Sequence, residues 1–410
     1  MIRSVVVHKW MTIFIIFFFY ATDPMLSSVS VSGGRNTGLW LLSISRDLFT
    51  NIFFREPIAI SANDHRLLNG LERCRVFVTG SFGGIGKELT VILSSLGCDV
   101  MLHTSTSRTL LSDHRNASNK NLRPMFVLDF KNMTNLFRAK ELAFSGPTDM
   151  IIHNAGLMSQ WASPYSIHCV NCIAPMVITL HMLPSLFHAA HPRIVFVGSS
   201  SHLRSKPYRS GDIKRVLDDR KQSTIKVKSC LDAYATSKYN LMLLSTALQT
   251  RLRGCDVSIH TIHPGIVDTP MLQGFFGGLV FPGRHRLLLS PRESAWNVLL
   301  GALRAPVITD DGHCKPSYII NRKPNVFFTA RSLTTARRKE QLEGTSELCF
   351  KELLQELPME MRCDVVQSLK TYKRLHSSSM ETTDSKIDSR VMLRRIACID
   401  GIIREVESIR

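Results

Sequence analysis

Short apolar runs alternate with helix-like stretches from residue 73 to residue 325. Each run is rich in β-branched or large apolar residues and ends at Gly, Asn, Asp, His or Ser, which is typical of buried strands. Six such runs lie at residues 76–78, 100–102, 125–128, 150–152, 194–197 and 257–262. Continuous apolar strands joined by helical crossovers predict the α/β class, with a doubly wound parallel sheet and helices on both faces.

The end of this domain carries two further signals. Tyr318–Ile320 is a seventh apolar run, which we expect to close the sheet at one edge. Ser290, Pro291 and Glu293 predict the start of a helix, because they supply the cap, a proline at the first position and the acidic partner of a capping box. We place the domain at residues 73–329.

The first 30 residues have the pattern of a secretory signal peptide or a membrane anchor. Basic residues at positions 3 and 9 precede the uncharged apolar run 11–21. This run is short for a bilayer span, so a cleaved signal and an uncleaved anchor both remain open.

Residues 31–72 form an amphipathic linker. Its apolar positions recur about once per helical turn, and Arg46 and Asp47 lie on the opposite side. The pattern fits a helix in the membrane interface, and it equally fits an ordinary packing helix.

Residues 330–410 form a C-terminal extension of mixed charge and mostly helical pattern, with a break rich in Ser, Thr and Asp at residues 377–389. One amphipathic stripe runs through it, formed by Leu348, Phe350, Leu353, Leu354 and Leu357. The stripe predicts packing on the main domain, or else a surface for a partner or for a homo-oligomer.

Composition narrows the class of protein. Hydrophobic residues make up 44% and charged residues 20%, which excludes a largely disordered chain. The net charge of +18 attracts phosphates or anionic lipids, but the basic residues are dispersed, so we expect no nucleic-acid partner. The ten cysteines lack the paired spacing of zinc sites, and we interpret them, Cys169 and Cys172 included, as thiols of a reduced, cytosol-facing domain without a metal.

A glycine-rich loop follows the first predicted strand and opens a helix, with the sequence Thr79-Gly80-Ser81-Phe82-Gly83-Gly84-Ile85-Gly86. Glycines let the backbone approach a pyrophosphate closely, and the helix start offers free N–H groups to it. Asp129 ends the third strand, and Asn154-Ala155-Gly156 follow the fourth at the same edge of the sheet. The combination predicts a Rossmann-type dinucleotide site.

These motifs resemble the short-chain dehydrogenase/reductase family, over residues 73–325. In the order of that family they are Thr79-Gly80 with Gly84-Ile85-Gly86, His153-Asn154-Ala155-Gly156, Asn171, Ser199, Tyr234 with Lys238, and Pro264-Gly265 with Thr269. His153 stands where the family has Asn. Within the family the chain is most similar to the retinol dehydrogenase and WW-domain oxidoreductase branch, through its Ser-Ser-His and His-Pro-Gly sequences.

The resemblance implies a nicotinamide cofactor held along this edge. It assigns cofactor contacts to Thr79, Gly80, Ser81, Gly84, Ile85, Gly86, Asp129, Asn154, Ala155, Gly156, Tyr234, Lys238, Pro264, Gly265 and Thr269. Asp129 would lie near the adenine and Thr269 near the nicotinamide carboxamide. Asn171 would fix a kink in its helix and hold a water that relays protons to Lys238.

The catalytic chemistry follows from what hydride transfer requires. An alkoxide formed from a carbonyl needs a proton donor beside its oxygen, and Tyr234 is the candidate. Lys238 lies four residues further, on the same helix face, where an ammonium stabilises the phenolate. Ser199 ends the fifth strand, where it could hydrogen-bond the substrate oxygen.

The choice of nicotinamide depends on the end of the second strand. An acidic side chain there would hold the ribose diol of NAD and repel a 2′-phosphate. This chain has hydroxyl side chains followed by Arg108 instead. We therefore expect NADP(H), with NAD(H) as the alternative.

Residues 271–281 are apolar and interrupted by glycines, which predicts a flexible cover for a lipophilic substrate such as a retinoid, a steroid or a fatty aldehyde. We expect an oxidoreductase that interconverts a lipophilic alcohol and its carbonyl at the endoplasmic reticulum membrane, or in a luminal or secreted form if the N-terminal segment is cleaved. The alternative is a catalytically weak dinucleotide-binding scaffold or sensor that acts through the C-terminal extension.

Overall fold

The structure is a computed structural model. It describes residues 43–45, 47, 48, 51, 60–106, 126–143, 146–219, 227–275, 284–304, 317–320, 323, 324, 336–379 and 389–409. The apolar run 11–21, Arg108 and residues 276–283 of the expected cover therefore lie outside the described residues.

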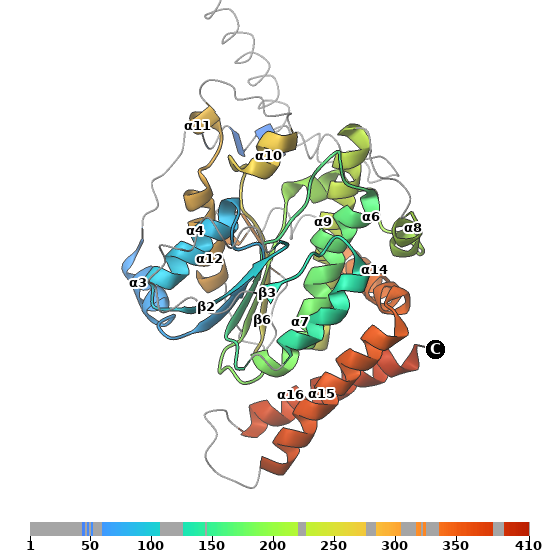
Figure 1. The fold of residues 1–410 in the computed structure, drawn as a ribbon. Helices are drawn as coiled ribbons and strands as arrows, with labels where there is room; N and C mark the ends of the chain where they lie inside the picture. Colours follow the sequence, from blue (N-terminus) through green and yellow to red (C-terminus); the bar gives the residue numbers. More distant parts are fainter. Residues whose placement is uncertain are drawn as a thin grey trace, which may run out of the picture.

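A single sheet forms the centre of the molecule (Figure 1). Its strands are β1 (Arg75–Val78), β2 (Asp99–Thr104), β3 (Phe126–Val127), β4 (Met150–His153), β5 (Arg193–Val197), β6 (Ser258–His263), β7 (Ser317–Ile320) and β8 (Lys323–Pro324). The spatial order is 3-2-1-4-5-6-7-8, and every neighbouring pair is parallel except β7 with β8. The doubly wound α/β fold is thus confirmed. The expected edge position of β7 is wrong, because β8 pairs with its outer side.

Alternate residues of each strand enter different cores, because side chains of a strand point to opposite faces. Val76 and Val78 pack with α4 (Gly84–Ser95) and α12 (Pro291–Arg304) on one face. Phe77 packs on the other face, in the core that includes η3 (Met133–Leu142), α7 (Ala174–Leu186) and α9 (Val227–Arg251). The predicted start of α12 is confirmed, since Ser290 and Glu293 form the reciprocal hydrogen bonds of a capping box.

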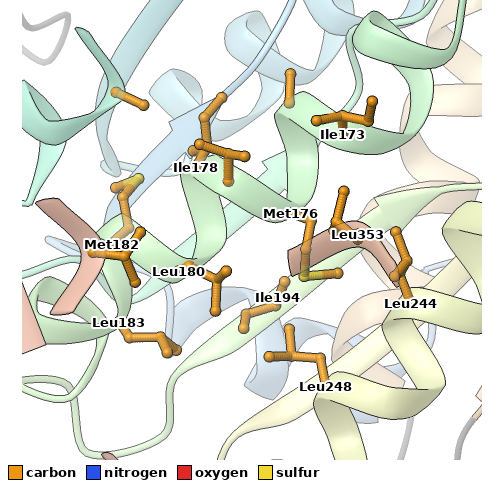
Figure 2. Close-up of a cluster of buried hydrophobic side chains, with 14 of the residues drawn as sticks. Ile173, Met176, Ile178, Leu180, Met182, Leu183, Ile194, Leu244, Leu248 and Leu353 are labelled. Atoms are coloured by element: carbon orange, nitrogen blue, oxygen red, sulfur yellow. The ribbon is translucent and has the colours of Figure 1, made fainter. Parts of the chain in front are cut away.

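Helix α7 is the central element of the larger core, and every one of its residues is buried. Figure 2 shows Met176, Leu180 and Leu183 directed toward Ile194 of β5 and Leu248 of α9. The helical stretch Pro164–Leu186, of which α7 forms the second half, is apolar and long enough to cross a membrane. Its complete burial inside the domain instead makes it a core helix.

The C-terminal extension forms three helices, α14 (Ala336–Glu356), α15 (Met359–Ser379) and α16 (Ser389–Ser408). They lie along α7 and α9 in Figure 1, and their apolar side chains belong to the same core. Phe350, Leu353, Leu354 and Leu357 of the predicted stripe are fully buried there, whereas Leu348 is 41% exposed and was wrongly included. The stripe therefore packs on the main domain.

Glu352 of α14 connects this extension to the segment that follows β5. Its buried carboxylate accepts hydrogen bonds from the Tyr208 hydroxyl (2.5 Å), the Gly211 N–H (2.9 Å) and the Lys214 N–H (3.0 Å). Two of these donors lie at the start of α8 (Asp212–Asp218), where N–H groups have no partner within the helix. The extension thus stabilises the chain between Ser199 and Tyr234.

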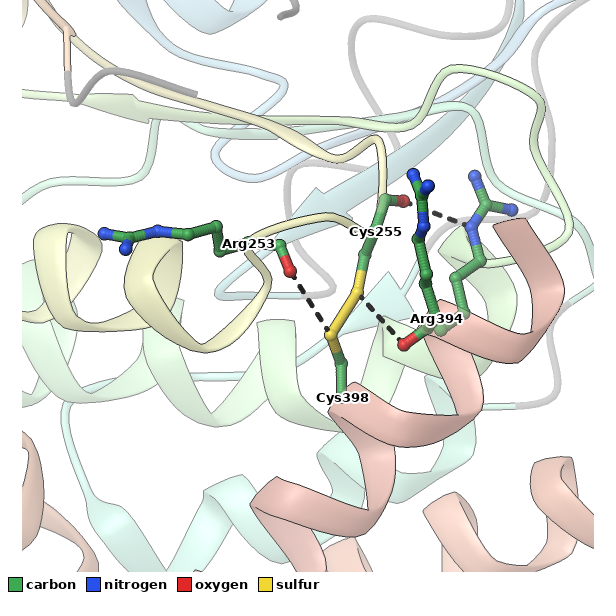
Figure 3. The surroundings of a disulfide bond; sticks show 5 residues. Arg253, Cys255, Arg394 and Cys398 are labelled. Atoms are coloured by element: carbon green, nitrogen blue, oxygen red, sulfur yellow. Dashed lines mark hydrogen bonds between the residues drawn. A yellow bond between two sulfur atoms is a disulfide. The ribbon is translucent and has the colours of Figure 1, made fainter. Parts of the chain in front are cut away.

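A disulfide bond joins the extension to the domain a second time (Figure 3). It links Cys255, in the loop before β6, to Cys398 on α16. The expectation of thiols throughout is wrong for this pair. Cys169 and Cys172 are buried as expected, and burial raises the pKa of the Cys172 thiol well above its ordinary value.

The N-terminal linker contacts the domain through its polar side. Residues 43–45, 47, 48 and 51 are helical, and we call them the N-terminal strap. Asp47 is 4% exposed and hydrogen-bonds His263 at 2.9 Å, so its expected position on the outer side is wrong. A packed helix, one of the two predicted alternatives, is therefore what these residues form.

Candidate active site

The glycine-rich loop between β1 and α4 is shaped by close backbone contacts. Gly80 and Gly84 adopt φ values of +67° and +46°, which favour glycine. At Gly86 a Cβ atom would lie 2.0 Å from the Gly80 carbonyl oxygen. Helix α4 begins at Gly84 without a side-chain cap, so its first N–H groups face the loop, as an anionic ligand requires.

The ends of β1 and β4 hold this loop in place. The Thr79 hydroxyl accepts a hydrogen bond from the Ala155 N–H (3.0 Å), and Asn154 Nδ2 donates to the carbonyls of Thr79 (3.1 Å) and Gly80 (3.2 Å). Cofactor contacts were predicted for these residues. The structure shows them binding one another, and their contact with a cofactor stays a prediction.

His103 of β2 is a loop-supporting residue that the sequence analysis missed. Its Nδ1 accepts from the Gly80 N–H (3.0 Å), so its Nε2 carries the proton and donates to the Leu128 carbonyl (2.9 Å). Burial lowers the pKa of His103 to about 4, which keeps the imidazole neutral. Ser81 completes the support, because its hydroxyl donates to the Val78 carbonyl (2.6 Å) and accepts from the His103 N–H (3.0 Å).

The remaining predicted cofactor residues surround the loop. Thr269 lies against it, since a Cβ atom on Gly84 would be 3.1 Å from the Thr269 methyl carbon. Gly265 has a φ of +90° after the buried Pro264. Asp129 lies after β3, where its carboxylate accepts from the Lys131 N–H (3.0 Å). The structure therefore brings these residues to the carboxyl edge of the sheet, where ligands of doubly wound folds bind.

Three of the four predicted catalytic residues meet at the end of β5. The Ser199 side chain lowers the pKa of Tyr234, while burial, the larger effect, raises it. Lys238 Nζ lies 5.9 Å from the centre of the Tyr234 ring and donates to the Val197 carbonyl at 2.7 Å. Burial lowers the pKa of Lys238 to about 8, so its ammonium is charged at neutral pH and lies next to the phenol.

Asn171, the fourth, lies in a π-helical turn, Cys169–Ile173, that interrupts the helix before α7. Its Oδ1 accepts from the Leu157 N–H (2.7 Å), and its Nδ2 donates to the Leu157 carbonyl (2.8 Å) and to the Ser237 hydroxyl (3.0 Å). The backbone irregularity is therefore present, and Asn171 connects the loop after β4 to the helix of Tyr234 and Lys238. The water relay to Lys238 stays a prediction.

Comparison with known proteins agrees with this arrangement. The sequence profile of the short chain dehydrogenases matches residues 75–210. Dehydrogenase/reductase SDR family member 13 of Bos taurus is 30% identical over 257 residues, which cover 60% of this chain and 66% of that protein. Over this region the chain resembles the short-chain dehydrogenase/reductase family.

Other curated relatives are less similar. Retinol dehydrogenase 13 of Homo sapiens is 27% identical over 207 residues, which cover 48% of this chain and 60% of that protein. The chain thus spans less than two thirds of the length of these two curated relatives. A short chain dehydrogenase of Escherichia coli CFT073 crystallised with NADPH is 20% identical, with coverage of 62% of this chain and 99% of that chain and a TM-score of 0.46.

The departure of this chain from the family at His153 has a structural basis. His153 ends β4, is fully buried and stacks on Phe196 at 5.0 Å between ring centres. Its Nε2–H donates to the Thr179 hydroxyl (2.8 Å), because that hydroxyl itself donates to the Pro175 carbonyl. Burial lowers the pKa of His153 to about 3, so the imidazole stays neutral and serves as a core residue.

Gly86→Ala is expected to abolish dinucleotide binding. The added methyl group would collide with the Gly80 carbonyl oxygen and with Asn154 Nδ2, and the loop must move. We expect the Kd for NADPH to rise more than about tenfold, with a loss of about 1–3 kcal/mol in unfolding free energy. Fluorescence titration and urea denaturation measure both. Gly83→Ala is the control, because its Cβ meets nothing within 4 Å. Wild-type affinity in Gly86→Ala would contradict the packing of this loop.

The charge of Lys238 makes the free energy of unfolding depend on pH. Its pKa falls from 10.5 in the unfolded chain to about 8 in the fold, so between these values the unfolded state binds more protons and stability rises with pH. Lys238→Met removes this rise. From pH 7 to pH 10, the unfolding free energy of the wild type should therefore rise relative to that of Lys238→Met, by about 3 kcal/mol at most. A difference that stays constant with pH would show that Lys238 is not desolvated.

Proposed function

We propose that this protein is an NADP(H)-preferring oxidoreductase that interconverts a lipophilic alcohol and its carbonyl. The meeting of Ser199, Tyr234 and Lys238 at the end of β5, on the same edge of the sheet as the glycine-rich loop, is the observation that carries the proposal. When bound, a nicotinamide cofactor would supply or accept the hydride. In the direction of reduction, Tyr234 protonates the alkoxide, Ser199 holds its oxygen, and the charge of Lys238 stabilises the phenolate that remains.

The surroundings of Tyr234 support a lipophilic substrate. Leu157, Met158 and Ala162 belong to the same apolar cluster as Tyr234, on the loop after β4. Met271 of α10 (Pro270–Phe275) approaches the same loop, since its methyl carbon lies 3.3 Å from the Cβ position of Gly156. A retinal, a steroid ketone or a fatty aldehyde fits such a lining, and one of the curated relatives is a retinol dehydrogenase.

The scaffold alternative, which acts through the C-terminal extension, loses one candidate surface. Phe350, Leu353, Leu354 and Leu357 of the stripe are buried in the core of the domain. We therefore interpret the extension as part of the catalytic domain. We keep membrane association as a proposal, and the Cys255–Cys398 disulfide supports a luminal or extracellular location over a cytosolic one.

Steady-state kinetics of the full chain test the proposal. Oxidation of NADPH and NADH is followed at 340 nm with all-trans-retinal, a 3-ketosteroid and decanal in detergent. We expect turnover with at least one of these carbonyls and a kcat/KM at least about tenfold higher for NADPH than for NADH. Binding of NADPH without turnover on any substrate would favour the scaffold, and a preference for NADH would overturn the cofactor assignment.

A further inference from the structure

The N-terminal strap docks on the domain through a polar face. Ser43, Asp47 and Asn51 are four residues apart, so they share one side of the helix, and all three are buried, with 3%, 4% and 8% exposure. Asn51 Nδ2 donates to the Leu287 carbonyl (2.8 Å), and the Asp47 carboxylate contacts His263. The strap thus lies at the carboxyl edge of the sheet, where its blue pieces are drawn in Figure 1.

The contact between Asp47 and His263 fixes the state of the imidazole. His263 Nδ1 accepts a hydrogen bond from the Ser200 N–H (3.3 Å), so this nitrogen carries no proton. Nε2 is therefore the protonated nitrogen, and it donates to Asp47 Oδ2 at 2.9 Å. A buried carboxylate in this position selects one tautomer and one orientation of the ring.

The peptide group between Ser199 and Ser200, whose N–H binds His263, is held at its carbonyl by a second histidine. His202 Nδ1–H donates to the Ser199 carbonyl (2.7 Å), and burial lowers the pKa of His202 to about 4, so this ring is neutral. The peptide between Ser199 and Ser200 thus has its carbonyl bound by His202 and its N–H bound by His263. This peptide carries the Ser199 side chain, whose hydroxyl accepts a hydrogen bond from the Ser201 N–H (3.1 Å) and lowers the pKa of Tyr234.

We propose that Asp47 is a positioning residue for Ser199, acting through His263 and the Ser199–Ser200 peptide. Without the carboxylate, His263 can take the Nδ1–H tautomer, which cannot accept from the Ser200 N–H. The peptide then loses the partner of its N–H, and the Ser199 hydroxyl loses its alignment with Tyr234. The proposal rests on the function proposed above. It assigns a role in the reaction to a segment far before β1 in the sequence.

The test compares three variants of the full chain, Asp47→Ala, Asp47→Asn and Asn51→Ala, with decanal and NADPH. Asn51→Ala is the matched control, because it removes the other polar anchor of the strap and leaves His263 untouched. The readouts are kcat, the KM for each substrate, the Kd for NADPH, and the ¹⁵N chemical shifts of His263, which report its tautomer.

We expect Asp47→Ala to lower kcat by about 10- to 100-fold while the Kd for NADPH stays within about twofold. Asp47→Asn should recover part of kcat, since its amide oxygen can accept from Nε2–H, and Asn51→Ala should keep kcat within about twofold. His263 should be the Nε2–H tautomer in the wild type and a mixture in Asp47→Ala.

Two results would overturn the proposal. One is wild-type kcat in Asp47→Ala, and the other is an equal loss in Asn51→Ala, which would mean that strap docking alone matters. If Asp47→Ala does not fold, the proposal is decided by whether Asp47→Asn has a lower kcat than the wild type. If the wild type shows no turnover with decanal, all-trans-retinal or the 3-ketosteroid, the proposed function fails, and the tautomer of His263 in the wild type and in Asp47→Asn still decides whether Asp47 controls the ring.

Discussion

Tyr234→Phe is expected to lower kcat by about 10²- to 10⁴-fold, the range that general acid–base catalysis contributes. The variant keeps the ring, which lies 5.9 Å from Lys238 Nζ, and loses only the hydroxyl, whose pKa the Ser199 side chain lowers. Without it the alkoxide oxygen loses the proton donor that the proposed mechanism assigns to Tyr234. Steady-state kinetics with NADPH measure kcat, and fluorescence titration should give a Kd for NADPH within about twofold of wild type.

Tyr239→Phe is the control, because Tyr239 is a partly buried tyrosine of the same helix and lies outside the catalytic set. We expect its kcat within about twofold of wild type and a loss of no more than about 1 kcal/mol in stability. Tyr234→Phe with undiminished turnover would remove Tyr234 from the mechanism. An equal loss in both variants would mean that the effect comes from the helix and not from the Tyr234 hydroxyl.

Arg395→Met is expected to be the most destabilising single change of a charged residue, at about 3–5 kcal/mol. Arg395 of α16 is fully buried, and burial lowers the pKa of its guanidinium. It donates to the carbonyls of Phe187 (2.7 Å), Ala189 (2.9 Å), Cys255 (3.2 Å) and Ala190 (3.3 Å). Three of these carbonyls follow the end of α7, where the helix itself offers no donors.

The matched control for this prediction is Arg394→Met, since Arg394 is the neighbouring residue and its side chain is exposed. Urea denaturation should show a change within about 0.5 kcal/mol for Arg394→Met. The Cys255–Cys398 disulfide is retained in both variants, so chain connectivity is the same. A change below about 1 kcal/mol in Arg395→Met would show that the C-terminal extension does not depend on this contact.

The strands could be predicted from the sequence because a parallel sheet buries both faces of its strands, which leaves continuous apolar runs. The glycine-rich loop and the Tyr234–Lys238 spacing are local, so a short stretch of sequence carries each of them. The edge strand β8 was missed because two paired residues are too few to form a pattern.

Buried polar side chains account for most of what the sequence could not predict. Asp47, His103 and Arg395 have the residue types of an exposed surface, and each is buried by partners that lie far away in the chain. Asp47 and His263, for example, are 216 residues apart. The disulfide raises the same difficulty, because ten scattered cysteines allow many pairings, and only the position of α16 brings Cys398 to Cys255.

Transfer of deuterium from the cofactor to the substrate tests the central claim most directly. The full chain is incubated with decanal and NADPH that carries deuterium at both positions of nicotinamide C4, and the alcohol is analysed by mass spectrometry. The account predicts one deuterium on the carbinol carbon of the product, formed by the wild type at least about 10²-fold faster than by Tyr234→Phe. Binding of both ligands without any labelled alcohol, or equal labelling by Tyr234→Phe, would contradict it.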